Sequence, residues 1–261
     1  APTGQRKVVL ATNIAETSLT IEGIRLVVDS AQERVASFDP RTGLTKLLTQ
    51  RISQASMVQR AGRAGRLEPG ICLHLISAEQ AERAAVQSTP EILQSDLSGL
   101  IMELLQWGCP DPAQLTWLNV PPAVNLAAAR ALLTQLGALD GERLSSRGQK
   151  MAALGNDPRL AAMLVAAQGD DEIATAAKLA AILEEPPRGA NCDLAQAFSR
   201  NQGNWQQRAQ QLCKRLNSRG GTPDADSIAP LLAQAFADRI ARRRGLDGRY
   251  QLANGMGAML D

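Results

Sequence analysis

Aromatic residues make up only 3% of this 261-residue chain, and histidine occurs once, at position 74. So few rings argue against the broad stacking platforms that many single-strand-binding proteins use. The four cysteines are far apart and form no Cys-x-x-Cys pair, which argues against a zinc site. Free thiols are typical of a reducing compartment, so we expect a cytoplasmic protein without a metal centre.

An excess of charge of one sign is also missing, because the formal net charge is only +2. Any binding to nucleic acid must therefore depend on local basic patches. No apolar run is long enough to span a bilayer and no signal peptide is present, so we expect no membrane partner. The hydrophobic fraction of 44% suffices for two or more small domains. The abrupt first and last residues indicate a piece of a longer protein.

Residues 59–66 form the most informative segment. Arg60, Arg63 and Arg66 follow one another at an interval of three, with two glycines between them and Gln59 in front. On a helix, residues three apart share a face, and guanidinium groups held so close repel one another unless an anion lies among them. Because guanidinium binds phosphate through two hydrogen bonds, the pattern predicts a site for phosphate groups. The alternative is a solvated, basic start of a helix.

A second segment, residues 11–21, reads Ala-Thr-Asn-Ile-Ala-Glu-Thr-Ser-Leu-Thr-Ile. Together with residues 59–66 it closely resembles motifs V and VI of the DEAH-box superfamily 2 helicases. Residues 144–148 and 157–160 resemble landmarks beyond the motor in the same family. The likeness extends from about residue 7 to residue 185, and two long motifs in the family's order make it specific.

This resemblance implies that Gln59, Arg63 and Arg66 are catalytic residues that contact the γ-phosphate of ATP. The two arginines would act as fingers that stabilise the charge of the transition state. Arg60 would make structural or interdomain contacts. ATP would bind with Mg²⁺, whose ligands we expect on a first RecA-like domain outside this chain. Neither a GxxxxGK[ST] phosphate loop nor Asp-Glu-x-His occurs here, so the chain would hold half of an ATPase site and be inactive alone.

The resemblance also implies roles for residues of motif V. Thr12 and Asn13 would bind phosphate oxygens of a nucleic-acid strand, a contact that short hydroxyl and amide groups can make. Thr20 and Glu22 would face the nucleotide, although the family commonly has Asp where this chain has Glu22. The alternative is that threonine and serine side chains here cap the following helix, and both can hold at once.

Residues 33–51 predict a β-hairpin, because two strand-like runs flank a turn-forming segment at residues 39–43. In the family the equivalent hairpin lies near the duplex junction. Arg34, Arg41 and Lys46 make this one basic, and we include them among the candidate contacts to nucleic acid. The alternative is a hairpin that only packs.

The predicted fold class is an α/β RecA-like domain with a partial parallel sheet, followed by a winged helix and an all-α bundle. Short buried strands are expected in the RecA-like domain at residues 8–11, 26–29 and 71–76. The four expected parts are the second RecA-like domain (residues 1–85), the winged helix (86–150), the helical ratchet (151–245) and the start of a truncated C-terminal region (246–261).

Two further expectations concern single residue types. Arg239 and residues 242–244 form the densest charge run, expected on a solvated face of a terminal helix. Trp107, Trp117 and Trp205 are expected to anchor cores, and His74 is expected to be structural.

The sequence therefore predicts the C-terminal portion of an ATP-dependent helicase that acts on single-stranded or tailed nucleic acid, with RNA favoured. A first alternative is a non-enzymatic winged-helix protein that binds nucleic acid and whose RecA-like domain is only structural. An upstream phosphate loop in the full gene would distinguish the two. A second alternative is a helicase acting chiefly on DNA, since no residue reveals a contact to the 2′-hydroxyl.

Overall fold

The computed structural model describes residues 7–17, 21–64, 66, 68–155, 157–187, 193–200, 203–245 and 247–259. The chain divides into two compact units. The first extends to Ser95, apart from the turn Pro40–Thr42, and the second begins at Asp96 and includes that turn.

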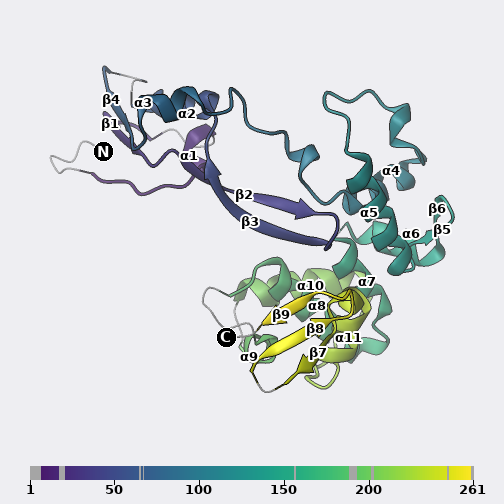
Figure 1. Cartoon of the computed structure of the whole chain (residues 1–261). Coiled ribbons are helices and arrows are strands. Elements are labelled where there is room, and N and C mark those ends of the chain that lie inside the picture. The colour runs from purple at the N-terminus through teal and green to yellow at the C-terminus, as the bar shows by residue number, and fades with distance from the viewer. Residues whose placement is uncertain are drawn as a thin grey trace. The chain divides into compact units, whose positions relative to one another are not determined.

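The first unit contains a small parallel sheet (Figure 1). Strand β1 (Leu26–Asp29) pairs with β4 (Ile71–His74), and Asp29 lies opposite His74. The strands predicted at residues 26–29 and 71–76 are confirmed, the second ending two residues early. Only one face of this sheet is covered by described residues, because Val28 and Ile71 are 59% and 63% exposed on the other. The expectation of strands buried on both faces was wrong.

The strand expected at residues 8–11 is absent from the described part of the chain. These residues have no regular structure, and Val8 and Leu10 are 79% and 95% exposed. Among the described strands, β1 pairs only with β4. An apolar run forms a strand only when a neighbouring strand satisfies its backbone groups, and no such partner lies beside residues 8–11 in the described chain.

The predicted hairpin is confirmed. It consists of β2 (Gln32–Asp39) and β3 (Leu44–Arg51), paired from Gln32 with Arg51 to Asp39 with Leu44. The turn is closed by the Gly43 amide, which donates to the Asp39 carbonyl at 2.9 Å. Gly43 has a φ of 65°, in the left-handed region that glycine adopts without strain.

Helices of the first unit are short: α1 (Ile14–Thr17), α2 (Gln54–Ala61), α3 (Ala78–Glu82) and a 3₁₀ turn, η1 (Glu91–Leu93). A small core of Ala31, Ile52 and Met57 packs beside α2. Partly buried apolar side chains complete it: Ile76, Ala81 and Ala84. The core is modest, so polar contacts matter to the placement of α2.

The second unit begins with helices and a two-stranded ribbon: α4 (Ser98–Trp107), η2 (Pro112–Gln114), α5 (Ala123–Gln135), β5 (Leu139–Asp140), β6 (Arg143–Leu144) and α6 (Ser146–Leu154). Gly108 ends α4 with φ 91°, in the left-handed region that glycine adopts without strain. The Asp96 carboxylate accepts from the Ser98 amide at 2.8 Å just before the helix. Gly148 packs so closely on Ala138, the residue before β5, that a Cβ there would lie 2.0 Å from the Ala138 carbonyl oxygen.

An all-α bundle follows: α7 (Pro158–Ala166), α8 (Gly169–Glu184), α9 (Leu194–Phe198), α10 (Gly203–Arg215), α11 (Ile228–Phe236) and a 3₁₀ turn, η3 (Ala237–Arg239). Asp157 caps α7, and its carboxylate accepts from the Arg159 amide at 2.9 Å. The bundle has an extensive apolar core whose largest fully buried side chains include Met163, Leu164, Leu179, Ile182 and Leu212.

The described chain closes with a three-stranded antiparallel sheet of β7 (Ala241–Arg244), β8 (Arg249–Leu252) and β9 (Gly257–Met259). The expectation that a terminal helix carries the arginine run was wrong, since residues 241–244 form a strand. The strand is stabilised by backbone hydrogen bonds to β8, which the sequence of residues 239–244 alone does not indicate. Trp107 was also wrongly expected in a core, because it is 74% exposed, whereas Trp205 is 2% exposed. Trp117 is partly buried and donates to the Pro112 carbonyl at 2.8 Å.

Candidate phosphate-binding site

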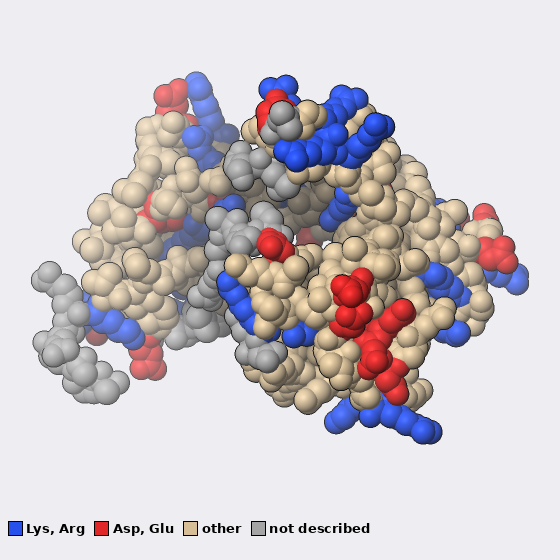
Figure 2. Space-filling model, turned by 90° about the horizontal axis from the view of Figure 1, so that it is seen from below, with Lys and Arg blue, Asp and Glu red and all other residues tan. Residues whose placement is uncertain are grey.

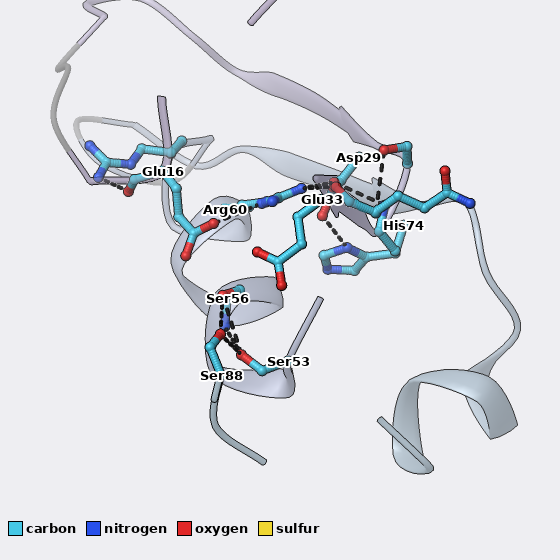
Figure 3. Close-up of polar contacts among 12 residues, drawn as sticks. Glu16, Asp29, Glu33, Ser53, Ser56, Arg60, His74 and Ser88 are labelled. Carbon is cyan, nitrogen blue, oxygen red and sulfur yellow. Dashed lines mark hydrogen bonds and ion pairs between the residues drawn. The ribbon is translucent and has the colours of Figure 1, made fainter. Parts of the chain in front are cut away.

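Helix α2 carries the first part of the arginine segment, and its start is fixed by hydroxyl groups. The Ser53 hydroxyl oxygen accepts from the Ser56 amide at 3.1 Å, which caps the helix. The hydroxyl groups of Ser56 and Ser88 lie 3.2 Å and 3.1 Å from that of Ser53 (Figure 3). The Gln54 side chain donates to the Ala84 carbonyl at 3.0 Å. The start of α2 is thereby bound to the segment that follows α3.

The helix ends within the arginine segment. The Gly62 amide donates to the Val58 carbonyl at 2.9 Å, and the chain then leaves the helix. Arg63 and Arg66 therefore lie beyond α2, and the expectation that all three arginines share one helical face was wrong. Glycine has low helix propensity, which accounts for an end at this position.

A close backbone contact also fixes the segment after the helix. Ala64 is 2% exposed, and Gly70 packs directly against it. A Cβ at Gly70 would lie 2.0 Å from the Ala64 carbonyl oxygen, so only glycine fits there without displacing the backbone.

Arg60 turns inward and makes a network of ion pairs (Figure 3). Its Nε donates to Glu16 Oε2 at 3.0 Å, and its Nη1 donates to Asp29 Oδ1 at 2.9 Å and to the Gln32 carbonyl at 3.1 Å. The side chains of Arg60 and Glu16 are 13% exposed and that of Asp29 is 4% exposed. Burial by itself would lower the pKa of Arg60, but the hydrogen bonds and charges of the two carboxylates raise it. The structural role expected for Arg60 agrees with these contacts.

Asp29 accepts further hydrogen bonds from two other parts of the first unit. The Ala31 amide donates to Asp29 Oδ1 at 3.0 Å, and His74 Nδ1 lies 3.1 Å from Asp29 Oδ2. With a carboxylate as acceptor, Nδ1 must carry the proton. Cys72 Sγ lies 3.7 Å from His74 Nε2. Burial, and secondarily the charge of Asp29, raise the pKa of the Cys72 thiol, so this sulfur is not an activated nucleophile.

Arg63 provides a second link between the two sequence motifs. Its Nη2 donates to the Glu16 carbonyl oxygen, so both Arg60 and Arg63 contact the same residue of motif V. Arg63 is partly buried, while Gln59 and Arg66 are exposed. Glu22 lies exposed in a turn that follows motif V. The expected nucleotide contact Thr20 lies outside the described residues.

Among the candidate nucleic-acid contacts, the structure brings Asn13 and Arg34 together. Both line a cavity of about 270 Å³ in the first unit, together with Gln50, Ser88 and Glu91. Thr12, which precedes α1, is exposed.

The basic residues of the hairpin do not share one face. Arg34 pairs with Thr49 and Lys46 pairs with Ser37. Since alternate residues of a strand point to opposite faces, Arg34 and Lys46 lie on opposite sides of the hairpin. Arg41 is exposed in the turn. Figure 2 likewise shows Lys and Arg in separate groups on the face it presents, consistent with a net charge of +2.

Sequence reasoning did not single out Glu16 or Asp29, although they organise the site. A usable signal was present for Asp29, a carboxylate that directly follows the apolar residues 26–28. Parallel strands end at the same edge of a sheet, so the pairing of β1 with β4 places Asp29 beside His74. Glu16 gave no comparable signal, because its partner Arg60 is 44 positions away.

Within the described residues, no group of three or more His, Cys, Asp or Glu side chains could hold a metal ion. The helices in this part of the chain are also too short or too polar to cross a membrane.

A RecA-like α/β unit with two motif segments held together by arginines, followed by a mostly helical region, defines the C-terminal part of a helicase motor. The family model for the helicase conserved C-terminal domain matches residues 1–68 of this sequence. Over its whole length the chain resembles the C-terminal part of a DEAH/RHA helicase.

The sequence is 81% identical over 261 residues to the ATP-dependent RNA helicase HrpB of Escherichia coli (strain K12), covering 100% of this chain and 32% of that protein. It is 39% identical over 165 residues to the mouse ATP-dependent RNA helicase DHX33, covering 62% of this chain and 24% of the relative. It is 41% identical over 166 residues to the human probable ATP-dependent RNA helicase DHX34, covering 63% and 14%.

The fold agrees with a crystal structure of the E. coli DEAH/RHA helicase HrpB at a TM-score of 0.96, with 81% identity over 100% of this chain and 33% of that one. A crystal structure of the E. coli DExH-box NTPase HrpB gives a TM-score of 0.89 at the same identity, covering 100% of this chain and 32% of that one. The chain thus spans about a third of the length of these relatives.

Proposed function

We propose that this chain is the C-terminal portion of an ATP-dependent RNA helicase and supplies half of its ATPase site. One observation carries the proposal: the polar side chains of residues 59–66 differ in how far they are buried. Arg60 is enclosed by Glu16 and Asp29, whereas Gln59 and Arg66 are exposed. The exposed Arg66 can therefore reach a ligand while Arg60 keeps the segment in place through its carboxylate partners.

In this proposal Arg63 and Arg66 contact the γ-phosphate of ATP, which is bound mainly by a RecA-like domain outside this chain. During hydrolysis negative charge spreads over the oxygens of the transferred phosphoryl group. Guanidinium groups already in place stabilise that charge without reorganising, and Gln59 would hydrogen-bond the phosphate or the attacking water. Thr20 and Glu22 would contact the rest of the nucleotide.

A Mg²⁺ ion bound with ATP would neutralise part of the phosphate charge. The described residues of this chain contain no suitable ligand cluster, so its ligands would belong to the other half of the site. Gln59, Arg63 and Arg66 fit the phosphate groups and not the metal, since they are a neutral amide and two cations.

On the nucleic-acid side, Thr12 and Asn13 would bind backbone phosphates of a single strand. Arg34 extends this surface, because it lines the same cavity as Asn13. Arg41 and Lys46 would contact the strand or the duplex end from other parts of the hairpin. In the second unit, α4 to α6 with β5 and β6 would form the winged helix, and α7 to α11 the ratchet bundle.

RNA is the favoured strand, because the relatives that match are named as RNA helicases. The same proposal places this helicase in the cytoplasm, with RNA as its substrate. The chain alone would bind no ATP productively and should not hydrolyse it. The first alternative is a nucleic-acid-binding protein without ATPase activity, and the second alternative is a helicase acting chiefly on DNA.

The test uses the full-length protein that contains this chain. Its ATPase activity should rise with single-stranded RNA more than with DNA of the same sequence. Arg66→Ala should lower kcat by a factor of order 10³ if this arginine stabilises the transition state. Arg83→Ala is the matched control, since Arg83 is an exposed arginine of the same unit paired with Glu79. A loss below about tenfold for Arg66→Ala in a folded protein would contradict the finger role.

A further inference from the structure

Asp29 belongs to neither of the two motifs, yet it connects both of them. Its Oδ1 accepts from Arg60 at 2.9 Å, and Arg60 in turn holds the Glu16 carboxylate at 3.0 Å. The Asp29 carboxylate also accepts from the Ala31 amide at Oδ1 and from His74 Nδ1 at Oδ2. Asp29 therefore anchors α2 and α1 to the carboxyl-terminal edge of the β1–β4 sheet.

The chain between this anchor and the proposed strand contacts is short and hydrogen-bonded. The Glu16 amide donates to the Asn13 carbonyl at 2.9 Å, and the Ala15 amide donates to the Thr12 carbonyl at 3.2 Å. A displacement of Thr12 or Asn13 is thus transmitted through one helical turn to Glu16. On the other side, the Glu16 carbonyl accepts directly from Arg63.

Burial makes these connections stiff. The Asp29 side chain is 4% exposed and that of Arg60 is 13% exposed. Arg60 Nη2 is enclosed as well, and it has no acceptor among the described residues. A buried guanidinium cannot leave its carboxylates for water without leaving charges unpaired, so Arg60 has few alternative positions.

We propose that Asp29 is the positioning residue that joins the strand-contacting segment, residues 12–17, to the phosphate-facing end of α2, so that binding of RNA adjusts Arg63. This inference rests on the proposed function, because it takes Arg63 as a contact to ATP and Thr12 and Asn13 as contacts to RNA. Asp29 itself touches neither ligand; it acts through Arg60 and Glu16.

The experiment measures the stimulation factor, which is kcat with saturating single-stranded RNA divided by kcat without it, in the full-length protein. Asp29→Asn keeps the size of the side chain and an acceptor oxygen but removes the charge that holds Arg60. The stimulation factor should fall about tenfold, the size of a typical coupling between two sites. The Kd for RNA and the KM for ATP should change by less than about twofold, because the direct contacts stay in place.

A purely structural role gives a different result. If Asp29→Asn only lowered the fraction of folded enzyme, the rates with and without RNA would fall together and their ratio would stay constant. Arg60→Lys is the second variant, since lysine keeps the charge but as a point charge cannot bind Glu16 and Asp29 in the fork geometry. It should reduce the stimulation factor as well, and it carries the test if Asp29→Asn does not fold.

Glu79→Gln is the matched control, because it removes an exposed carboxylate of the same unit, one that pairs with Arg83 at 2.7 Å. Its stimulation factor should equal that of the wild type. An unchanged factor in both Asp29→Asn and Arg60→Lys overturns the coupling role. A wild-type protein whose ATPase does not respond to RNA instead contradicts the proposed function, so the two failures are distinguishable.

Discussion

Arg159 and Asp238, 79 positions apart, form a two-pronged ion pair: Nη1 lies 2.7 Å from Oδ1 and Nη2 lies 2.8 Å from Oδ2. Arg159 Nη1 also donates to the Ala235 carbonyl at 2.8 Å, and its guanidinium carbon lies 5.4 Å from the centre of the Phe236 ring. The arginine at the start of α7 thereby holds the end of α11 and the turn η3 that leads into β7. The resemblance marked residues 157–160 as a landmark, and this pairing gives Arg159 a physical role.

The first prediction concerns the stability of the second unit. Asp238→Ala leaves a nearly buried guanidinium without its carboxylate, so we expect the free energy of unfolding to fall by about 3 kcal/mol. Asp247→Ala should cost less than about 1 kcal/mol, because the pair it forms with Arg249 is more than half exposed. Urea unfolding of the chain, followed by circular dichroism, measures both. Similar losses for the two variants would mean that burial of the Arg159–Asp238 pair contributes nothing.

The second prediction is a pH dependence from the same pair. Burial by itself would raise the pKa of Asp238, but the hydrogen bonds and charge of Arg159 outweigh it and lower the pKa below its ordinary value. The ionised form is therefore favoured in the folded state. Its stabilisation is complete above the unfolded pKa of about 4 and disappears as the pH falls through the lower, native value.

Asp238→Asn should accordingly be less stable than the wild type at pH 7, and the difference should shrink below about pH 4. Unfolding free energies measured from pH 7 to pH 2 give both curves. A difference that stays constant over this range would show that Asp238 does not ionise differently in the folded state.

The third prediction concerns the close contact behind the arginine segment. Gly70→Ala places a methyl group 2.0 Å from the Ala64 carbonyl oxygen, so the backbone must move. We expect a loss of about 1–3 kcal/mol in stability and a lower kcat of the full-length ATPase, since Ala64 lies between Arg63 and Arg66.

Gly99→Ala is the control for that substitution. Gly99 lies inside α4, and no atom would meet an added Cβ within 4 Å. Alanine is the better helix former, so this variant in the first turn of α4 should lose no stability. Thermal unfolding separates the two glycines, and equal effects would mean that the contact with Ala64 imposes no constraint.

The fourth prediction uses the register of the hairpin. Arg34→Ala should weaken binding of single-stranded RNA and reduce the slope of log K against log salt by about one, because one phosphate contact is lost. Lys46→Ala removes an equal charge from the opposite face and should affect binding less. Titrations at several salt concentrations with the full-length protein test this. A larger loss for Lys46→Ala would place the strand on the other side of the hairpin.

Features whose partners lie a few residues away could be predicted from the sequence. The Asp157 cap of α7, the glycine that ends α4 at position 108 and the hairpin of β2 and β3 all depend on neighbours in the chain. A cap or a tight turn is stabilised by hydrogen bonds within one turn, so residue identity alone predicts it. The same local information located Gln59, Arg63 and Arg66 as one segment.

Other features depend on contacts that only folding brings together. Arg60 lies 44 positions from Glu16 and 31 from Asp29, so its enclosure had no local signal beyond the resemblance. Residues 241–244 have the charge of a solvated helix but become β7 because β8 pairs with them. The amino-acid sequence by itself indicated the family resemblance, the arginine segment, the start of α7 at Asp157 and the end of α4 at Gly108. Tertiary structure decided that Arg60 is enclosed while Arg66 is exposed, because enclosing a charge requires carboxylates supplied from distant parts of the chain.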